Sequence, residues 1–402
     1  MSGGRTGSSS DPAGPELRLT VPGLALIAIC YGFAWFAYGY FVPAFRTEFG
    51  IESPLIGGIG ALGFLGYCAA IRGSWLLADR FGARPVTLLA GAVASLGMAF
   101  VAIAQSPASL AIGIFVTGMS AAAALPPVML TVTLWSDAPR EDRLPPLLSV
   151  GTGLGVAVVV PVGLLVADDW RLAWAGFAVL TVVATFWVWR ALPRIPTERG
   201  RSRFPDDVPA LADVPPRTLP LALAAGAMGV ASSAVWVFGR DVVEQAAAAS
   251  AAGSAWLWGM IGGAGLLTVA AGDATRRFGL RPSWTLGMVA LSAATATFGL
   301  GAHRLALTFL AAVIFGAAYV VLTAAILRWG THLSPHEPTS GLRIGLLSIV
   351  VGHMIGAALV GELLQVAEPA TVFQAMASIA VLGALLRPRR LGPGQLPARP
   401  DP

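Results

Sequence analysis

The 402-residue chain is 56% hydrophobic and only 12% charged, with a mean hydropathy of +0.74. Soluble domains carry about a quarter charged residues, so this composition excludes a protein whose whole surface faces water. The formal net charge of +5 could suggest nucleic acid as a partner. The arginines instead lie in short segments between apolar runs, as in membrane-protein loops, so we expect a lipid bilayer and no nucleic acid.

Twelve runs are long and apolar enough to cross a bilayer, whose hydrocarbon core needs about 20 apolar residues in a helix. Lipid cannot satisfy open backbone groups, so each run is expected to be helical and the fold class to be an all-α membrane protein. In chain order the runs are 21–44, 54–78, 85–104, 108–135, 145–167, 171–190, 217–239, 253–274, 283–302, 305–328, 340–363 and 369–387.

Polar segments divide these runs into two equal sets. The longest connection, residues 191–216, is rich in proline and charge, which is typical of a linker. It separates a predicted N-terminal bundle, 21–190, from a C-terminal bundle, 217–387. Residues 1–20 and 388–402 are expected to be polar tails, and the first run is too long for a cleaved signal peptide.

The arginines also predict the orientation of the chain. With both termini in the cytoplasm, all but four of the 26 basic residues lie on the cytoplasmic side. The four that lie outside are Arg46, Arg171, Arg240 and Arg304. Positive loops face the cytoplasm, so we expect a multi-pass protein of the plasma (inner) membrane with both termini inside.

A short charged stretch lies between the second and third runs and occurs twice. Residues Gly73–Pro85 read G-S-W-L-L-A-D-R-F-G-A-R-P, and Arg277–Pro282 repeats R-F-G-x-R-P about 197 residues later. We expect Asp79, Arg80 and Arg84 to share a short loop. The helix dipole disfavours an acid at a helix C-terminus, so Asp79 is expected to pair with Arg80 or Arg84. The alternative is that all three are solvated residues that only set the topology.

Twelve runs in two sets, with this charged loop between the second and third, resemble the major facilitator superfamily. The family signature in this loop is matched by Leu77, Ala78, Asp79, Arg80, Gly82 and Arg84, whereas Trp75 and Ala83 depart from it. The resemblance covers roughly residues 20–390 and implies two pseudo-symmetric six-helix bundles. It also implies a conformational latch at Asp79, Arg80, Gly82, Arg84, Arg277, Gly279 and Arg281.

The resemblance does not extend to the signatures of drug–proton antiporters. In that branch the fourth span carries an arginine four residues before a glycine, and here Ile114 holds that place before Gly118. Drug–proton antiport is therefore less favoured than other transport, although it stays open.

Transporters of this fold bind cargo near the bilayer midplane, where polar side chains are costly and usually functional. Tyr31, Trp35 and Tyr38 recur at helical spacing in the first run and could form an aromatic wall with polar tips. Further candidates for the cargo cavity are Ser232, Ser233, Trp236, Tyr319 and Thr323. Ordinary helix packing is the alternative for all of these residues.

His353 lies near the middle of the eleventh run and is the one side chain at this depth that titrates near neutral pH. It is the candidate for proton coupling. The alternative is a neutral histidine bonded to a backbone carbonyl or to cargo, because no aspartate or glutamate accompanies it at midspan.

A charged pair lies at the outer end of the seventh run. We expect Arg240 and Asp241 to form an exposed pair or an outer gate there.

Catalysis is not indicated by any motif. The chain contains no lysine and hence no phosphate-binding loop of the P-loop type, which argues against ATP-driven transport. Cys30 and Cys68 both lie in apolar runs and are expected to be packed thiols. His332 and His336 flank a proline and lack the zincin pattern. We expect no enzyme activity, no cofactor and no metal.

The leading hypothesis is a secondary active transporter that moves a small organic solute by alternating access, with protons as the coupling ion that the resemblance implies. Within transporters, a drug or metabolite exporter and a monocarboxylate-like uptake permease both stay open. The alternative from another class is a non-transporting membrane sensor or assembly partner. No coiled coil is present in the sequence, and a monomer is expected.

Overall fold

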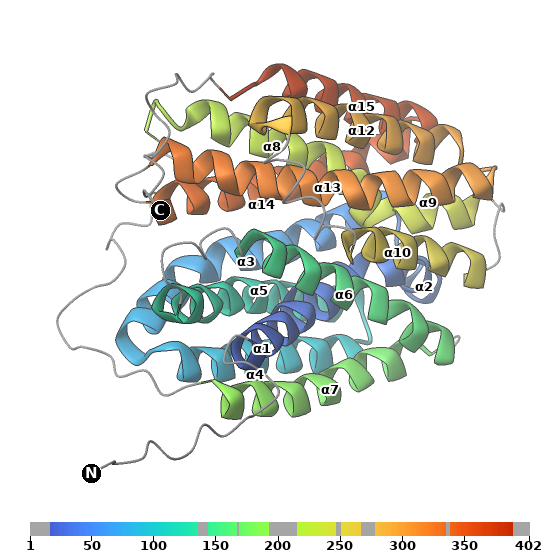
Figure 1. Cartoon of the computed structure of the whole chain (residues 1–402). Helices are drawn as coiled ribbons and strands as arrows, with labels where there is room; N and C mark the ends of the chain where they lie inside the picture. The colour runs from blue at the N-terminus through green and yellow to red at the C-terminus, as the bar shows by residue number, and fades with distance from the viewer. Residues whose placement is uncertain are drawn as a thin grey trace, which may run out of the picture.

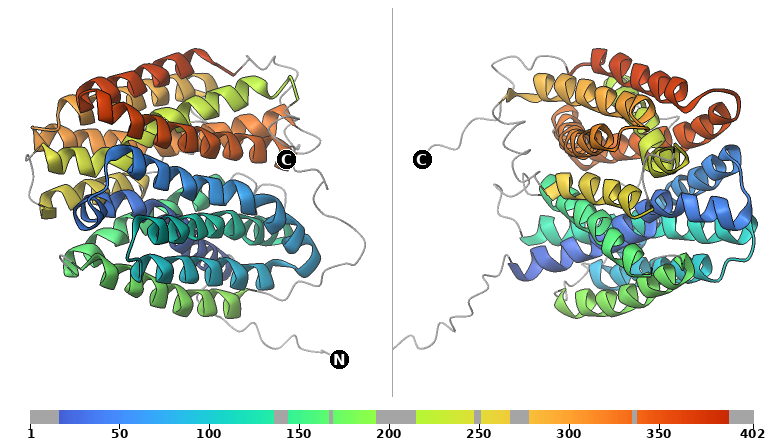
Figure 2. Two further views of the ribbon diagram at one scale, coloured as in Figure 1. Left: turned by 180° about the vertical axis from the view of Figure 1, so that it is seen from behind. Right: turned by 90° about the vertical axis from the view of Figure 1, so that its right-hand side faces the viewer.

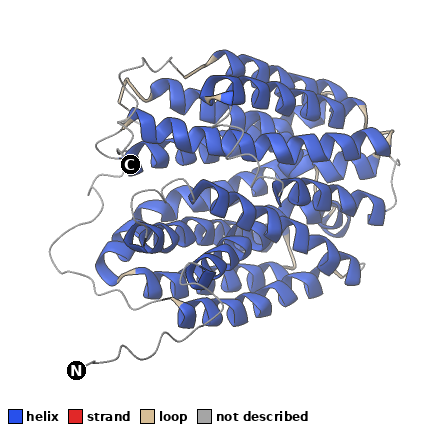
Figure 3. Cartoon of the chain, viewed as in Figure 1, coloured by secondary structure: helices blue, strands red, loops and turns tan. Residues whose placement is uncertain are grey.

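The computed structural model describes residues 17–135, 144–166, 169–192, 215–246, 251–266, 278–334 and 338–388. Helices make up nearly all of these residues, and no strand occurs among them (Figure 3). The expected all-α fold is confirmed.

The first part of the chain begins with a continuous helical rod that changes its winding twice. A π-helical segment η1 (Ala28–Phe36) separates α1 (Leu17–Ile27) from α2 (Ala37–Phe49). The helices that follow are α3 (Ser53–Phe81), α4 (Ala83–Ala102), α5 (Pro107–Trp135), α6 (Leu144–Leu165) and α7 (Trp170–Ala191).

The second part opens in the same way. A π-helical segment η4 (Ala234–Phe238) joins α8 (Leu219–Ser233) to α9 (Gly239–Gln245). It continues with α10 (Ala251–Leu266), α12 (Leu280–Leu300), α13 (Leu305–Leu333), α14 (Pro338–Val366) and α15 (Pro369–Leu385).

Each of the twelve runs expected from the sequence overlaps a described helix. In the described part of the chain, nine helices are long and apolar enough to cross a membrane. Two apolar helices, Val150–Leu165 and Pro369–Leu385, are shorter. The run 253–274 is described only as far as residue 266. Twelve crossings therefore stay a prediction, whereas a multi-pass membrane protein is supported.

The helices gather in two groups that follow the order of the chain, one below and one above in Figure 1, and the views in Figure 2 agree. Helices α3, α4, α5 and α7 pack together in the first group, and α8, α12, α13, α14 and α15 in the second. Contacts between the groups run mainly through α3 against α14 and α6 against α10. The two groups thus meet along a long seam of facing helices.

The charged hairpin differs from the expected loop. Helix α3 continues through Asp79 and Arg80 to Phe81, and only Gly82 separates it from α4. The physical reason is that aspartate, arginine and phenylalanine all tolerate helical geometry. The chain turns at Gly82 because its φ is +83°, which favours glycine. Gly279, the equivalent residue of the repeat, has the same φ of +83°.

Candidate functional site

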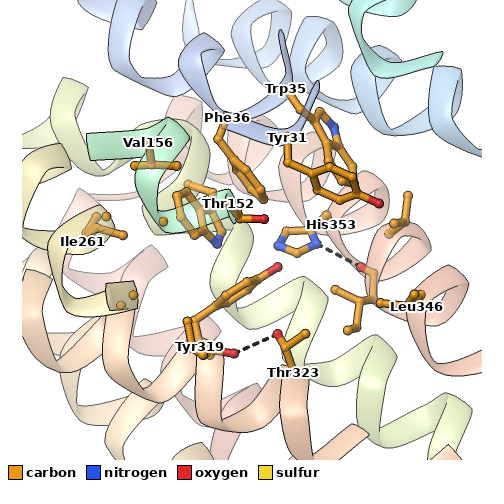
Figure 4. Close-up of a pocket in the computed structure, with 18 of the residues that line it drawn as sticks. Tyr31, Trp35, Phe36, Thr152, Val156, Ile261, Tyr319, Thr323, Leu346 and His353 are labelled. Carbon is orange, nitrogen blue, oxygen red and sulfur yellow. Dashed lines mark hydrogen bonds between the residues drawn. The ribbon is translucent and has the colours of Figure 1, made fainter. Parts of the chain in front are cut away.

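A cavity lies where the two groups of helices meet, with about 840 Å³ of empty space including its open side. Its walls come from η1, α3 and α6 on one side and from η4, α10, α13 and α14 on the other. Figure 4 shows Tyr31, Trp35 and Phe36 on one wall and Tyr319 and Thr323 on another, with His353 between them. A concave lining of mostly apolar and aromatic side chains with a few polar groups is typical of small-molecule sites.

Five of the eight cargo residues expected from the sequence line this cavity: Tyr31, Trp35, Trp236, Tyr319 and Thr323. The rings of Tyr31 and Trp35 meet edge to face, with centroids 5.3 Å apart. Trp236 meets Tyr319 at the same centroid distance of 5.3 Å and an interplanar angle of 79°. Both halves of the chain therefore contribute aromatic walls.

The other three expected cargo residues lie outside the lining. Tyr38 is buried, and its hydroxyl donates to the Ile56 carbonyl at 2.8 Å. In a regular α-helix, Tyr38 would lie on the same face as Tyr31 and Trp35. The π-helical winding of η1 rotates the residues that follow it by a different angle, so Tyr38 lies outside the wall that Tyr31 and Trp35 form. Ser233 donates to the Val230 carbonyl at 2.7 Å within its own helix.

Ser232 lies behind the wall, where it contacts His353. The His353 Nδ1 lies 3.0 Å from the Ile349 carbonyl, and Nε2 lies 3.1 Å from the Ser232 hydroxyl. A carbonyl only accepts, so Nδ1 carries a proton. The Ser232 hydroxyl also lies 2.7 Å from the Met228 carbonyl. It can donate either to Nε2 or to this carbonyl, and in the second case Nε2–H donates to Ser232. Both the neutral and the charged imidazole are thus fully hydrogen-bonded.

The ring of His353 is held firmly in place. It stacks on Phe64 from the other half of the chain, with centroids 4.9 Å apart and an interplanar angle of 12°. The centroid of the Tyr319 ring lies 6.0 Å away. His353 lines the cavity although only 1% of its surface is exposed. Its imidazole therefore occupies the junction of the two halves.

Sequence reasoning missed much of the lining. Phe36 bridges the halves by packing on Trp236, with centroids 4.2 Å apart. Tyr67 stacks on Trp35 at 5.2 Å and an interplanar angle of 8°. Thr152 completes the polar part of the lining. An aromatic residue in a long apolar run carries no sequence signal that separates a cavity wall from the core, so these residues could be found only from the structure.

An ion pair joins the two halves at one end of the seam; its aspartate is buried and its arginine is half-buried. Arg46 donates to both carboxylate oxygens of Asp241, from Nε at 3.0 Å and from Nη2 at 2.8 Å. The Asp241 side chain is 2% exposed and that of Arg46 is 24% exposed. Arg46 also donates to Ser53 at 3.0 Å, and Gln245 donates to Asp241 at 2.9 Å. This network, Arg46–Asp241 with its neighbours, ties α2 to α9.

The expectation of an exposed Arg240–Asp241 pair is wrong, because both residues are buried and each has other partners. Arg240 pairs with Glu244 at 3.5 Å, and its guanidinium lies 4.2 Å from the centroid of the Tyr40 ring. It also donates to the Tyr40 carbonyl. Adjacent positions on a helix point in different directions, so the two charges reach different neighbours.

The other end of the seam has a different contact. The guanidinium of Arg343 on α14 lies 5.6 Å from the centroid of the Trp75 ring on α3, and both residues are buried. Ser53 and Trp75 are 22 residues apart on one helix, or about 33 Å at 1.5 Å per residue. The contacts at Arg46 and at Arg343 therefore lie at opposite ends of α3, with the cavity between them.

The predicted latch residues lie at the second of these ends. Asp79 is half-buried, and the Arg80 guanidinium lies 5.4 Å from the centroid of the Phe81 ring. Arg84 donates to the Trp189 carbonyl at 2.9 Å, which ties α4 to α7. In the repeat, Gly279 and Arg281 are half-buried, and Arg277 lies outside the described residues.

No group of three or more potential metal ligands occurs in the described ranges. Cys30 is buried and Cys68 is half-buried, and both are free thiols.

Comparisons with known proteins agree with this architecture. The family model of the Major Facilitator Superfamily matches residues 24–336. The chain is 28% identical over 189 residues to the uncharacterized transporter YgaY of Escherichia coli O157:H7, a match that covers 46% of this chain and 48% of that protein. The chain thus matches about half the length of the curated relatives it resembles.

Two solved structures share the fold at low sequence identity. A mutant form of the nucleoside transporter NupG superposes with a TM-score of 0.73 at 15% identity, covering 91% of this chain and 98% of its own. A bacterial homolog of the human lysosomal transporter Spinster, in an inward-facing and occupied conformation, has a TM-score of 0.69 at 15% identity, covering 94% and 97%. At these identities the likeness concerns the fold alone.

Proposed function

Because this chain belongs to the Major Facilitator Superfamily, we propose that it is a secondary active transporter that moves a small organic solute by alternating access. The observation that carries the proposal is the cavity at the junction of the halves, with an inter-half contact at each end of α3. Alternate breaking of the two contacts would expose the cavity first to one side of the membrane and then to the other.

The moving units in this proposal are the bundles 21–190 and 217–387, joined by the linker 191–216. The arginine distribution assigns the Arg46–Asp241 end to the outside and the Arg343 end to the cytoplasm. The protein then lies in the plasma membrane with both termini inside, and we propose a monomer, for which one chain supplies all the residues that line the cavity. The matching backbone of Gly82 and Gly279 supports a latch at both copies of the hairpin.

The proposed coupling ion is the proton, with His353 as its acceptor. The support is the arrangement of Ser232, which can donate to a neutral imidazole or accept from a charged one. Loading or releasing a proton would change the hydrogen bonds of Ser232 and the charge beside the cavity. Coupling requires that the two conformations differ in proton affinity, and in this proposal the difference comes from rearranging the contacts of His353 when the halves move.

A flux experiment tests the proposal. Proteoliposomes are loaded with a mixture of amino acids, monocarboxylates, nucleosides and uncharged aromatic amides, and mass spectrometry measures which solute leaves under a pH gradient of either sign. We expect selective depletion that slows in Asp79→Asn and persists in Glu368→Gln, whose side chain is exposed and distant from the hairpin.

The sign of the effective gradient separates an exporter from an uptake permease. Folded protein that depletes no solute under either gradient would contradict the proposal and favour the non-transporting sensor.

A further inference from the structure

We propose that the cavity selects an uncharged solute that has a flat ring and at least one hydrogen-bond acceptor. The inference rests on the proposed function, because it takes this cavity as the cargo site. Three features of the walls carry it: their charge, their shape and their unpartnered donors.

Apart from His353, no acidic or basic side chain of the described residues lines the cavity, so a charged cargo would meet no permanent counter-ion there. The carboxylate of Asp241, near one end, already accepts hydrogen bonds from Arg46 and Gln245. An ion that leaves water for an apolar site without a partner is strongly disfavoured. The walls therefore select against carboxylates and ammonium ions.

The shape of the walls favours a flat ring. Trp35 and Tyr67 stack nearly parallel, and Phe36 packs on Trp236 across the halves. Trp236 in turn meets Tyr319 at 79°, and all five of these rings line the cavity. Aromatic pairs prefer offset-stacked or edge-to-face contacts, so a flat cargo ring can pack against such walls in either way.

Two unpartnered polar groups of the lining are donors. The indole N–H groups of Trp35 and Trp236 are buried and have no hydrogen-bond partner within the described part of the chain. Trp236 is only 5% exposed. The Thr323 hydroxyl donates to the Tyr319 carbonyl at 2.8 Å, so its donor is used and its oxygen can still accept. An indole N–H can only donate, so a cargo that brings an acceptor can pair with a buried donor that otherwise has no partner.

Probes that are compared with one neutral indole test charge, shape and acceptor separately. We would measure dissociation constants by equilibrium dialysis, with the full chain purified in detergent at pH 7. The probes are indole-3-acetamide (neutral, with an acceptor), indole-3-acetate (anion), tryptamine (cation), 3-ethylindole (no acceptor) and cyclohexylacetamide (no flat ring). We expect indole-3-acetamide to bind more tightly than each of the others by about tenfold, the change expected from about 1.4 kcal/mol.

Trp236→Phe keeps a flat ring and removes the donor. We expect it to weaken indole-3-acetamide about three- to tenfold, as for one lost hydrogen bond, and to leave 3-ethylindole unchanged. Trp174→Phe is the matched control, because the Trp174 N–H is also buried and unpartnered within the described residues but lies outside the lining. It should change the binding of neither probe.

Equal or tighter binding of the anion or the cation, binding of none of the ring probes, or an equal loss in Trp174→Phe would each overturn the inference. The failure of the transport proposal looks different. Selective binding of indole-3-acetamide without flux would contradict transport but support the inferred ligand class. Flux of charged solutes would support transport and contradict only the inferred ligand class.

Discussion

The buried ion pair between Arg46 and Asp241 makes the sharpest prediction about conformational change. Arg46→Gln removes a charge and two hydrogen bonds of 3.0 and 2.8 Å, and it leaves the 2%-exposed carboxylate of Asp241 with only Gln245 among the contacts described above. Removing one partner of a buried pair costs about 3–5 kcal/mol. In the open conformation that the proposed alternating access requires, both groups would be hydrated, so the cost would fall on the closed conformation alone.

A shift of about 3 kcal/mol changes the ratio of closed to open protein by about 100-fold. The reporter is a cysteine at Ala357, which is fully buried and whose backbone carbonyl lies against Gly57 of α3 across the seam at this end. In a background with Cys30→Ala and Cys68→Ala, we expect Arg46→Gln to raise the rate of maleimide labelling at position 357 by one to two orders of magnitude.

The matched control is Arg171→Gln. It breaks an ion pair of the same 2.8 Å length to Glu48, but the two side chains are 35% and 41% exposed and both belong to the first half. Exposed pairs contribute about 0–1 kcal/mol, so the labelling rate should not change. The charge swap Arg46→Asp with Asp241→Arg should restore part of the slow labelling. An unchanged labelling rate in Arg46→Gln, or an equal rise in Arg171→Gln, would refute the role of the Arg46–Asp241 pair in stabilising the closed conformation.

Three further predictions concern coupling and packing. His353→Gln should keep solute exchange and abolish its dependence on the pH gradient, measured as counterflow at equal and unequal pH; a surviving pH response would exclude His353 as the proton acceptor. Gly118→Ala should lower thermal stability by about 1–3 kcal/mol, because its Cβ would overlap the Gly63 carbonyl where α3 and α5 pack. The control Gly58→Ala has open space around it and should be neutral or stabilising in the same thermal scan. Gly82→Ala should cost about 1–2 kcal/mol because its φ is +83°, and unaltered unfolding would contradict that backbone conformation.

The sequence determined the class of protein and the order of its helices. Lipid leaves only one way to satisfy the backbone of a long apolar run, so length and hydropathy are enough to predict a helix. The repeat of the charged hairpin likewise predicted a connection at Gly82 and at Gly279, where positive φ favours glycine.

Tertiary structure alone decided which residues form the site. With α-helical spacing, Tyr31 and Tyr38 would share one helix face. In the structure, where η1 is π-helical, Tyr31 lines the cavity and Tyr38 instead donates to the Ile56 carbonyl. The partner of Asp241 proved to be Arg46, 195 residues away, and not its neighbour Arg240. In a chain that is apolar throughout, hydrophobic pattern does not distinguish core, lipid face and cavity wall, because side-chain direction depends on local winding and on helices far away in sequence.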